Sequence, residues 1–395
     1  MAPHLLCVGG EDHALRIPFL LALQNRGLRV SAAGTGAAGA FAENGISYHQ
    51  YQFDRFGVGL SDSASMGQLA QVVKRACPDV IQTFDTKPNL LAPLALRGSV
   101  PVVRTINGMG WVFSSTEPRA LAFRPFYLAM QRLAACWTAA TVFQNKADKS
   151  FFHRYRLLGK SLSTVIGSSG IDTAAFETAQ ARMASPAVLR AELGLDDAEI
   201  VVTVSRLTVQ KGIATLLEAA QIVHQVRPKA RFLLVGPRES EGPFAIDQAL
   251  IERHAPYVVA TGARSDIPAL LGIADLFAFP TEYREGIPRV LLEAGLAGVP
   301  IVASRMPGCD DVVVEDWNGR LVPPRDPRAL AAAILDLLQD SAHAKIMGQR
   351  SIEMVRQEFD LNVVADRYAE VYSHLLSLSR SCDERVAAYS SSAVQ

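Results

Sequence analysis

The chain has 395 residues, of which 49% are hydrophobic and 20% charged, and its formal net charge is zero. A chain of this size can bury more than one hydrophobic core, so we expect two domains. Its five cysteines are odd in number and scattered, and neither they nor the eight histidines show metal-ligand spacing, which favours reduced thiols and no metal site. No signal peptide opens the chain and no apolar run approaches ~18 residues, so we expect a cytoplasmic protein, or one peripheral to a membrane.

The zero net charge hides an asymmetry between the two halves. Residues 1–170 carry 17 Lys and Arg against 9 Asp and Glu, a balance of +8, and residues 171–395 carry the opposite balance of −8. A basic half indicates an anionic partner, such as nucleic acid, a phosphorylated acceptor or the anionic leaflet of a membrane. Chance variation between domains is the alternative.

The chain opens with a pattern typical of a Rossmann-like domain. A strand is predicted over 5–8, a helix over 14–26 and a second strand over 28–32, with Gly9 and Gly10 directly after the first strand. The full G-x-G-x-x-G fingerprint is missing at this turn, so a dinucleotide site is poorly supported.

Two further strands in this half each end in a polar loop. The strand predicted over 79–84 is followed by Asp85 and Lys87, and the strand over 101–105 leads into Asn107. Ligands of doubly wound sheets bind outside the carboxyl ends of the strands, so Asp85 and Lys87 are candidate site residues.

The segment 119–137 mixes arginines with aromatic and aliphatic residues at helical spacing. Such a helix could lie on a membrane interface, or it could be a core helix whose arginines extend to solvent, and the sequence favours neither. Small residues then cluster at 166–172, where we place the junction between a first domain, 1–170, and a second domain, 171–380. Residues 381–395 are predicted to be a disordered tail.

The second domain opens with a β-branched run over 200–204, typical of a parallel strand that is buried on both faces. Arg206 and Lys211 bracket the loop between this strand and a helix predicted over 213–226. A guanidinium fork and an ammonium can both reach a diphosphate from such a loop, although two solvated cations are the alternative. Strands are also predicted over 231–236 and 258–261.

A strand, loop and helix unit follows at 274–294. The strand ends at Pro280, and the helix begins at about Pro288, after Glu285 and Gly286. The exposed amides of the first helical turn face any bound anion and are favoured by the helix dipole. These amides belong to Ile287, Arg289 and Val290. If both acids were helical, Glu285 and Glu293 would lie about 12 Å apart along the axis, one on either side of the anion. Helices are also predicted over 326–338 and 359–376.

The unit at 279–294 and the segments after it, 298–304, 307–309 and 318–323, resemble the donor-site motif of retaining glycosyltransferases of family 4, which have the GT-B fold. This resemblance implies two Rossmann-like domains facing across a cleft, with a C-terminal helix that crosses back to the first domain. Arg206 and Lys211 match the family's Gly-Arg-Leu and Lys-Gly motif, except that Ser205 replaces the usual Gly.

The resemblance also assigns roles to individual residues. It implies that Gly9 and Gly10 contact the donor phosphates or the acceptor, that Arg264 and Ile267 line the base pocket, and that Asn107 lies on the acceptor side with Asp85 and Lys87. Many members carry a histidine where this chain has Phe84 and Asn107, so histidine-assisted activation is in doubt and Asp85 becomes the general-base candidate. The candidate catalytic residues are Arg206, Lys211, Glu285 and Asp85, and Gly286, Ile287, Arg289, Val290 and Glu293 complete the donor set.

The predicted function is therefore transfer of a hexose or hexosamine from a nucleotide-sugar, with UDP the commonest family donor, to a glycan acceptor. The likeness to members that act on lipid-diphosphate carriers, together with the basic half, favours a polyprenyl-diphosphate-linked acceptor in surface polysaccharide assembly. We expect no metal or other cofactor, because Arg206, Lys211 and the helix start can stabilise the leaving diphosphate. We expect no nucleic-acid partner, and peripheral contact with the anionic inner leaflet. A sugar-nucleotide epimerase and a non-catalytic nucleotide-sugar-binding subunit are the two alternatives.

Overall fold

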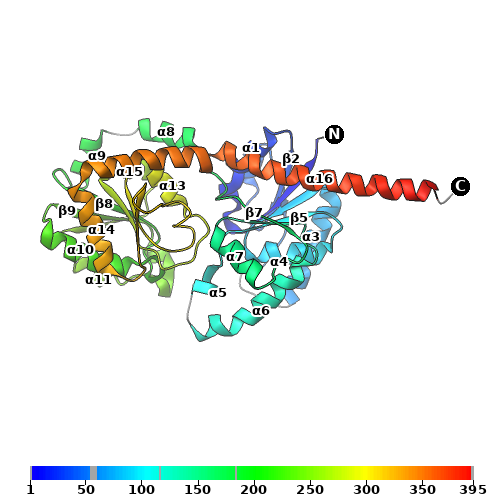
Figure 1. Ribbon diagram of the computed structural model, residues 1–395, viewed down its shortest axis with the longest axis horizontal. Coiled ribbons are helices and arrows are strands. Elements are labelled where there is room, and N and C mark those ends of the chain that lie inside the picture. The colour runs from blue at the N-terminus through cyan, green and yellow to red at the C-terminus, as the bar shows by residue number, and fades with distance from the viewer. Residues whose placement is uncertain (1, 54–59, 115–116, 183–184, 393–395) are drawn as a thin grey trace. The chain divides into compact units, whose positions relative to one another are not determined.

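The computed structural model describes residues 2–53, 60–114, 117–182 and 185–392. The chain divides into two compact units (Figure 1). Unit 1 comprises Met1–Gly108, Thr116–Gly170 and Leu361–Gln395, and unit 2 comprises Met109–Ser115 and Ile171–Asp360. The division after Gly170 coincides with the predicted junction.

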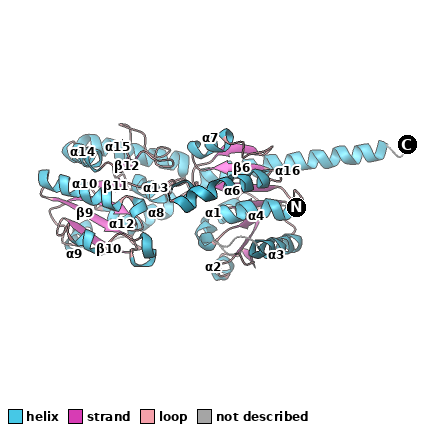
Figure 2. Ribbon diagram, turned by 90° about the horizontal axis from the view of Figure 1, so that it is seen from below, coloured by secondary structure: helices cyan, strands magenta, loops and turns pink. Residues whose placement is uncertain are grey.

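Unit 1 is built on a parallel sheet of seven strands in the order β3-β2-β1-β4-β5-β6-β7. The strands are β1 His4–Val8, β2 Arg29–Gly34, β3 Ser47–Gln50, β4 Val80–Thr83, β5 Val102–Ile106, β6 Ala140–Phe143 and β7 Leu162–Val165. Every residue of β1, β4, β5 and β6 is buried, because helices cover both faces of the sheet (Figure 2).

The helices of unit 1 are η1 Glu11–Arg16, α1 Ile17–Gln24, α2 Gly39–Glu43, α3 Leu60–Ala76, α4 Thr86–Leu96, α6 Pro118–Ala135, α7 Lys146–Arg154 and α16 Leu361–Ser392. Helix α16 is the chain's return to unit 1, as the resemblance predicts. Its residues Val364, Tyr368 and Tyr372, spaced four apart on one face, are fully buried in the unit 1 core.

The position of α16 differs from the predicted domain limits, which placed residues up to 380 in the second domain. The burial of its apolar face among residues of β1, β4 and α1 is the physical reason that residues from Leu361 onward belong to unit 1. The helix is described as far as Ser392, beyond residue 380, where the sequence predicts a disordered tail.

Unit 2 contains a parallel sheet of six strands in the order β10-β9-β8-β11-β12-β13. The strands are β8 Glu199–Val204, β9 Ala230–Val235, β10 Val258–Gly262, β11 Leu276–Phe279, β12 Ile301–Ser304 and β13 Gly319–Val322. Two apolar clusters, one on each face, bury β8, β9 and β11 and explain their continuous apolar sequences.

The helices of unit 2 are α5 Gly110–Ser114, α8 Thr173–Ala181, α9 Pro186–Glu192, η2 Val209–Lys211, α10 Ile213–Val226, η3 Glu239–Phe244, α11 Gln248–Glu252, α12 Ile267–Gly272, α13 Arg289–Leu296, α14 Pro327–Gln339, α15 Ser341–Met354 and η4 Val355–Phe359. Helix α5 comes from the first half of the sequence, yet it belongs to unit 2. The hydroxyl Oγ of Ser114 accepts a hydrogen bond from the backbone N–H of Arg284 at 2.9 Å.

Each unit therefore has the Rossmann-like topology that the sequence predicts. In each sheet the strand order reverses next to the unit's first strand, between β1 and β4 in unit 1 and between β8 and β11 in unit 2. Ligands of such sheets bind at the carboxyl ends of the strands at this reversal. The loops after β1, β4, β8 and β11 carry most of the predicted site residues, whereas Asn107 follows β5, and Arg264 and Ile267 follow β10.

Candidate functional site

Lys211 and Glu285 form an ion pair in unit 2, with 2.6 Å between Nζ and Oε1. Lys211 follows β8 and Glu285 follows β11, and these two strands are neighbours in the sheet. The hydroxyl of Thr281 also donates to Glu285 Oε1, at 3.3 Å. The side chains of Lys211 and Glu285 are only 10% and 21% exposed, so solvent screens their charges weakly. We call Lys211, Thr281 and Glu285 the unit 2 cluster.

Two glycines allow the loops around this cluster to approach one another. Gly212 has φ +68°, and a Cβ at this position would lie 1.9 Å from the carbonyl oxygen of Pro280. A Cβ on Gly308, at φ +89°, would lie 1.6 Å from the carbonyl oxygen of Gly286. Any side chain at these positions would push the backbones apart, so the glycines are required for the geometry of the cluster.

Arg206 lies on the same segment as Lys211 but pairs with a different acid. Its Nη1 is 3.0 Å from Oε2 of Glu241, in η3, and the Arg206 side chain is 55% exposed. The described contacts place Glu285 beside Lys211 and Glu241 beside Arg206. Glu241 could not be predicted from the sequence, because an acid in a polar segment carries no local signal of its partner.

Glu293 lies in α13, whereas Glu285 lies in the loop that precedes the helix. The helical spacing of about 12 Å that the sequence analysis considered therefore does not apply to this pair. Arg289 Nε donates to Glu293 Oε1 at 3.1 Å, one turn along α13. Burial raises the pKa of Glu293, and the charge of Arg289 opposes that shift. The helix itself begins at Arg289, with Pro288 as its N-cap, one residue later than predicted.

The predicted base-pocket residues lie at the start of α12. The guanidinium of Arg264 makes two contacts with Asp266, at 2.8 and 2.5 Å, and one with Glu192 at 3.4 Å. Hydrogen bonding to Asp266 raises the pKa of Arg264. Ile267 packs partly buried against the unit 2 core. The guanidinium that the resemblance assigns to the base pocket is thus engaged by acids of its own domain.

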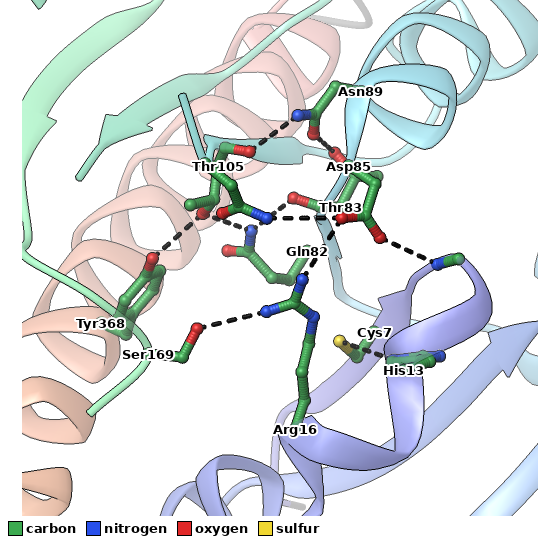
Figure 3. A network of polar contacts seen from close by, with 12 residues as sticks. Cys7, His13, Arg16, Gln82, Thr83, Asp85, Asn89, Thr105, Ser169 and Tyr368 are labelled. Carbon is green, nitrogen blue, oxygen red and sulfur yellow. Dashed lines mark hydrogen bonds and ion pairs between the residues drawn. The ribbon is translucent and has the colours of Figure 1, made fainter. Parts of the chain in front are cut away.

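In unit 1, Asp85 joins two of the other predicted residues (Figure 3). The backbone N–H of Gly10 donates to Asp85 Oδ2 at 3.0 Å, and Asn107 Nδ2 donates to Oδ1 at 3.4 Å. Asp85 has φ +69°, an uncommon backbone conformation for a non-glycine residue. Arg16, which the sequence analysis missed, contacts Oδ1 at 3.4 Å. We call Gly10, Arg16, Asp85 and Asn107 the unit 1 cluster.

Gly9 has a packing role that the sequence analysis did not foresee. A Cβ at Gly9 would lie 2.7 Å from the imidazole of His13, so the ring occupies the space that the glycine leaves. His13 is 1% exposed, and its Nε2 lies 3.3 Å from Cys7 Sγ (Figure 3). Burial, with a contribution from Arg16, lowers the pKa of His13 to about 3, so the ring is neutral at physiological pH. The amide of Gly10 is likewise already donated to Asp85.

Lys87 is the predicted acceptor-side residue that the structure does not join to Asp85. Its ammonium pairs with Asp62 on α3. Helix α4 begins at Thr86, directly after Asp85, and carries the Lys87 side chain toward α3. The sequence places Lys87 only two residues from Asp85 and therefore could not separate their directions.

A buried polar network supports the turn that carries Asp85 (Figure 3). The hydroxyl of Thr83 donates to Asn89 Oδ1 at 2.6 Å, and Asn89 Nδ2 donates to the carbonyl oxygen of Thr105 at 2.7 Å. The hydroxyl of Thr105 lies 3.0 Å from that of Tyr368 on α16. Because every member is buried, the network fixes the ends of β4 and β5 relative to one another and to α16.

Neither a metal centre nor a membrane span is found in the described parts of the chain. Within residues 2–53, 60–114, 117–182 and 185–392, no three His, Cys, Asp or Glu side chains are grouped so that they could hold a metal ion. Over the same residues, no helix combines the length and apolar character needed to cross a bilayer.

Comparison with known proteins assigns the family. The pattern described as Glycosyl transferases group 1 matches residues 198–340, and the pattern described as Glycosyl transferase 4-like domain matches residues 19–168. The N,N'-diacetylbacillosaminyl-diphospho-undecaprenol alpha-1,3-N-acetylgalactosaminyltransferase of Campylobacter jejuni is 27% identical over 310 residues, covering 78% of this chain and 80% of the relative. The GDP-mannose-dependent alpha-(1-6)-phosphatidylinositol monomannoside mannosyltransferase of Mycolicibacterium smegmatis is 30% identical over 300 residues, covering 71% and 74%.

Among solved structures, Anabaena HepE in complex with UDP matches with a TM-score of 0.77 and 21% identity, covering 94% of this chain and all of that one. At this identity the match shows the fold alone. The two patterns, the relatives and the shared fold lead to one conclusion: the chain belongs to the family 4 glycosyltransferases, enzymes with the GT-B fold of two Rossmann-like domains.

Proposed function

We propose that this glycosyltransferase moves a hexose or hexosamine from a UDP-sugar to a polyprenyl-diphosphate-linked glycan, with retention of anomeric configuration. The acceptor class is supported by the Campylobacter relative, whose name specifies a diphospho-undecaprenol acceptor. UDP is supported by the HepE complex, whereas the Mycolicibacterium relative is named for GDP-mannose. The base is therefore the part of the proposal that a direct binding test must decide.

The observation that carries the proposal is the Lys211–Glu285 pair at the carboxyl end of the unit 2 sheet. An ammonium there can stabilise the charge that grows on the diphosphate as the sugar–phosphate bond breaks. A carboxylate accepts hydrogen bonds and can orient the sugar hydroxyls. Glu285 also holds Lys211 in place, so the pair positions both the ammonium that stabilises the diphosphate and the carboxylate that orients the sugar.

Other residues of unit 2 complete the proposed donor site. The Arg206 side chain is 55% exposed, so its guanidinium can turn from Glu241 to contact the diphosphate. The amides of Arg289 and Val290, which open α13, have no acceptor in a preceding turn and favour an anion, whereas the Leu291 amide donates to the Pro288 carbonyl. Glu293 would hold the ribose hydroxyls. These groups balance the diphosphate charge, so we propose that transfer needs no metal or other cofactor.

In unit 1 we propose that Asp85 receives the proton of the acceptor hydroxyl. The hydroxyl oxygen bonds to the anomeric carbon on the face from which the nucleoside diphosphate leaves, so the configuration is retained. The Oδ1 atom of Asn107 is buried and has no hydrogen-bond partner among the described residues. Leaving such an acceptor unpaired costs about 1–3 kcal/mol. A hydroxyl of a bound acceptor would pair with it beside Asp85.

We further propose that the protein works at the cytoplasmic face of a membrane and that α6 contacts anionic lipid. One face of this helix is buried and includes Tyr127, so it packs as a core helix. Leu121, Phe126 and Leu133 are nevertheless exposed large apolar side chains on the same helix. Together with the arginines of α6 and the positive balance of residues 1–170, this surface fits the chemistry of an anionic leaflet.

The test is incubation of the purified protein with labelled UDP- and GDP-sugars and a polyprenyl-diphosphate-linked glycan, with and without EDTA. The proposal predicts label on the lipid-linked product from a UDP-sugar, unaffected by EDTA. A converted nucleotide-sugar without transfer would indicate an epimerase, and binding without reaction would indicate a non-catalytic subunit. Transfer from GDP-sugars alone would overturn the choice of base.

A further inference from the structure

Arg16 is the member of the unit 1 cluster that has no assigned role. Its guanidinium carbon lies 3.9 Å from the centroid of the Phe84 ring, and its side chain is 14% exposed. Its Nη2 contacts Asp85 Oδ1 at 3.4 Å, and its Nη1 donates to Ser169 Oγ at 3.2 Å (Figure 3). The guanidinium therefore lies between the Asp85 turn and the segment that ends unit 1 at Gly170.

The contacts of Arg16 are few for a buried guanidinium. Its Nε is buried and has no partner in the described parts of the chain. Arginine offers five N–H donors, and a buried donor without a partner lowers stability. A side chain held for stability alone would be better satisfied, so this arrangement favours a functional reason for placing the charge beneath Asp85.

The two oxygens of Asp85 are held differently. Oδ2 accepts the amide of Gly10 at 3.0 Å, which fixes the plane of the carboxylate. Among the residues that the structure describes, Oδ1 has two long contacts, both 3.4 Å, from Arg16 and Asn107. The charge of Asp85 also contributes to the raised pKa values of Cys7 and Tyr51, after burial as the main cause, so both groups are neutral beside it. Because both contacts orient Oδ1 but are long, this oxygen can still accept a proton from a ligand hydroxyl.

We propose that Arg16 is a positioning residue that orients Asp85 Oδ1 toward the acceptor hydroxyl. This inference rests on the proposed role of Asp85 in acceptor activation. Arg16 acts through the carboxylate and does not touch the substrate. Its planar guanidinium reaches Asp85 and Ser169 together while its carbon lies over the Phe84 ring, which the ammonium of a lysine cannot reproduce.

The experiment compares R16Q, R16K, D85N and the double variant R16Q/D85N, with R75Q as a matched control on an exposed arginine of α3. R16Q is expected to lower kcat by about 10–100-fold, the scale of a misplaced reacting group, with R16K in between. UDP binding, measured by calorimetry, is expected to match that of the unaltered protein. In the D85N background, R16Q is expected to cause no further loss of kcat.

Each outcome decides between the two proposals. If D85N keeps full activity, the proposed role of Asp85 is wrong, and the role of Arg16 with it. The inference about Arg16 alone is overturned if D85N lowers kcat but R16Q does not. It is likewise overturned if the losses of kcat in R16Q and D85N multiply in the double variant. Should R16Q unfold at lower temperature, R16K decides: it keeps the charge and most of the packing, so full activity in a folded R16K variant contradicts the need for a planar fork.

Discussion

Replacing Lys211 by alanine removes the ammonium that lies 2.6 Å from Glu285 in unit 2. A unit charge about 4 Å from a diphosphate oxygen contributes about 4 kcal/mol at an effective dielectric constant of about 20. The Lys211 side chain is only 10% exposed, so this dielectric is more appropriate than that of water. Part of the attraction exists in the ground state, so we expect kcat to fall by about 10²–10³-fold, as for the loss of one charge-stabilising donor.

The assay is the initial rate of label transfer at saturating donor, with UDP affinity measured separately. K229A is the matched control, because Lys229 is exposed and precedes β9, at the amino ends of the strands of the same sheet, whereas Lys211 lies beyond their carboxyl ends. The alanine variant also leaves Glu285 without its cation, so we expect a lower melting temperature in K211A than in the double variant K211A/E285Q. A K211A protein that is folded and keeps turnover within threefold of the control would refute the role of the ammonium.

Three further predictions concern stability and surface binding. G212A should lower the free energy of unfolding by more than about 2 kcal/mol, because the new Cβ would lie 1.9 Å from the carbonyl oxygen of Pro280. The control G39A should leave the free energy of unfolding almost unchanged, because a Cβ there would meet nothing within 4 Å. Burial lowers the pKa of His13 from 6.5, its value in the unfolded chain, to about 3 in the folded state. Between these pH values the unfolded chain binds one more proton than the folded protein, so stability falls as the pH drops. We expect the free energy of unfolding, measured by denaturant titration at several pH values, to change by up to about 1.4 kcal/mol per pH unit because of this group. This contribution should be absent in H13Q, and the same pH dependence in H13Q would contradict a buried neutral ring. The double variant F126S/L133S should sediment less with vesicles that contain phosphatidylglycerol and should transfer sugar to a soluble acceptor analogue at the normal rate. If the variant and the unaltered protein sediment equally, this face of α6 is not the lipid contact.

The two Rossmann-like domains were predictable because both sheets are parallel and buried on both faces. Strands such as β8 and β11 therefore appear as continuous apolar runs, and each is followed by a polar loop at a strand end where ligands bind. The same rule directed attention to Lys211, Glu285 and Asp85, whose roles stay predictions. Each of these residues has a local signal, since it follows a buried strand within a few positions.

The pairings among these residues were not predictable to the same degree. Glu285 lies 74 positions from Lys211 in the chain, and Arg206 is closer in sequence to Lys211 than either is to its acid, yet Arg206 contacts Glu241. The side-chain direction of Lys87, toward Asp62, depends on where helix α4 begins. Arg16 lies in a helical stretch without any strand-end signal, so only the contact with Asp85 reveals it.

Local pattern thus specifies which segments form strands, helices and strand-end loops, because burial on both faces and turn chemistry act over a few residues. Tertiary structure decides which of the charged side chains meet, since the register of parallel strands and the close approach of Gly212 and Gly308 to facing carbonyl oxygens bring distant loops together. It also decides that α16 completes the first unit, because its apolar face is buried among residues that lie about 200 to 370 positions earlier in the sequence. Such contacts depend on the whole fold, and no window of the sequence contains both partners.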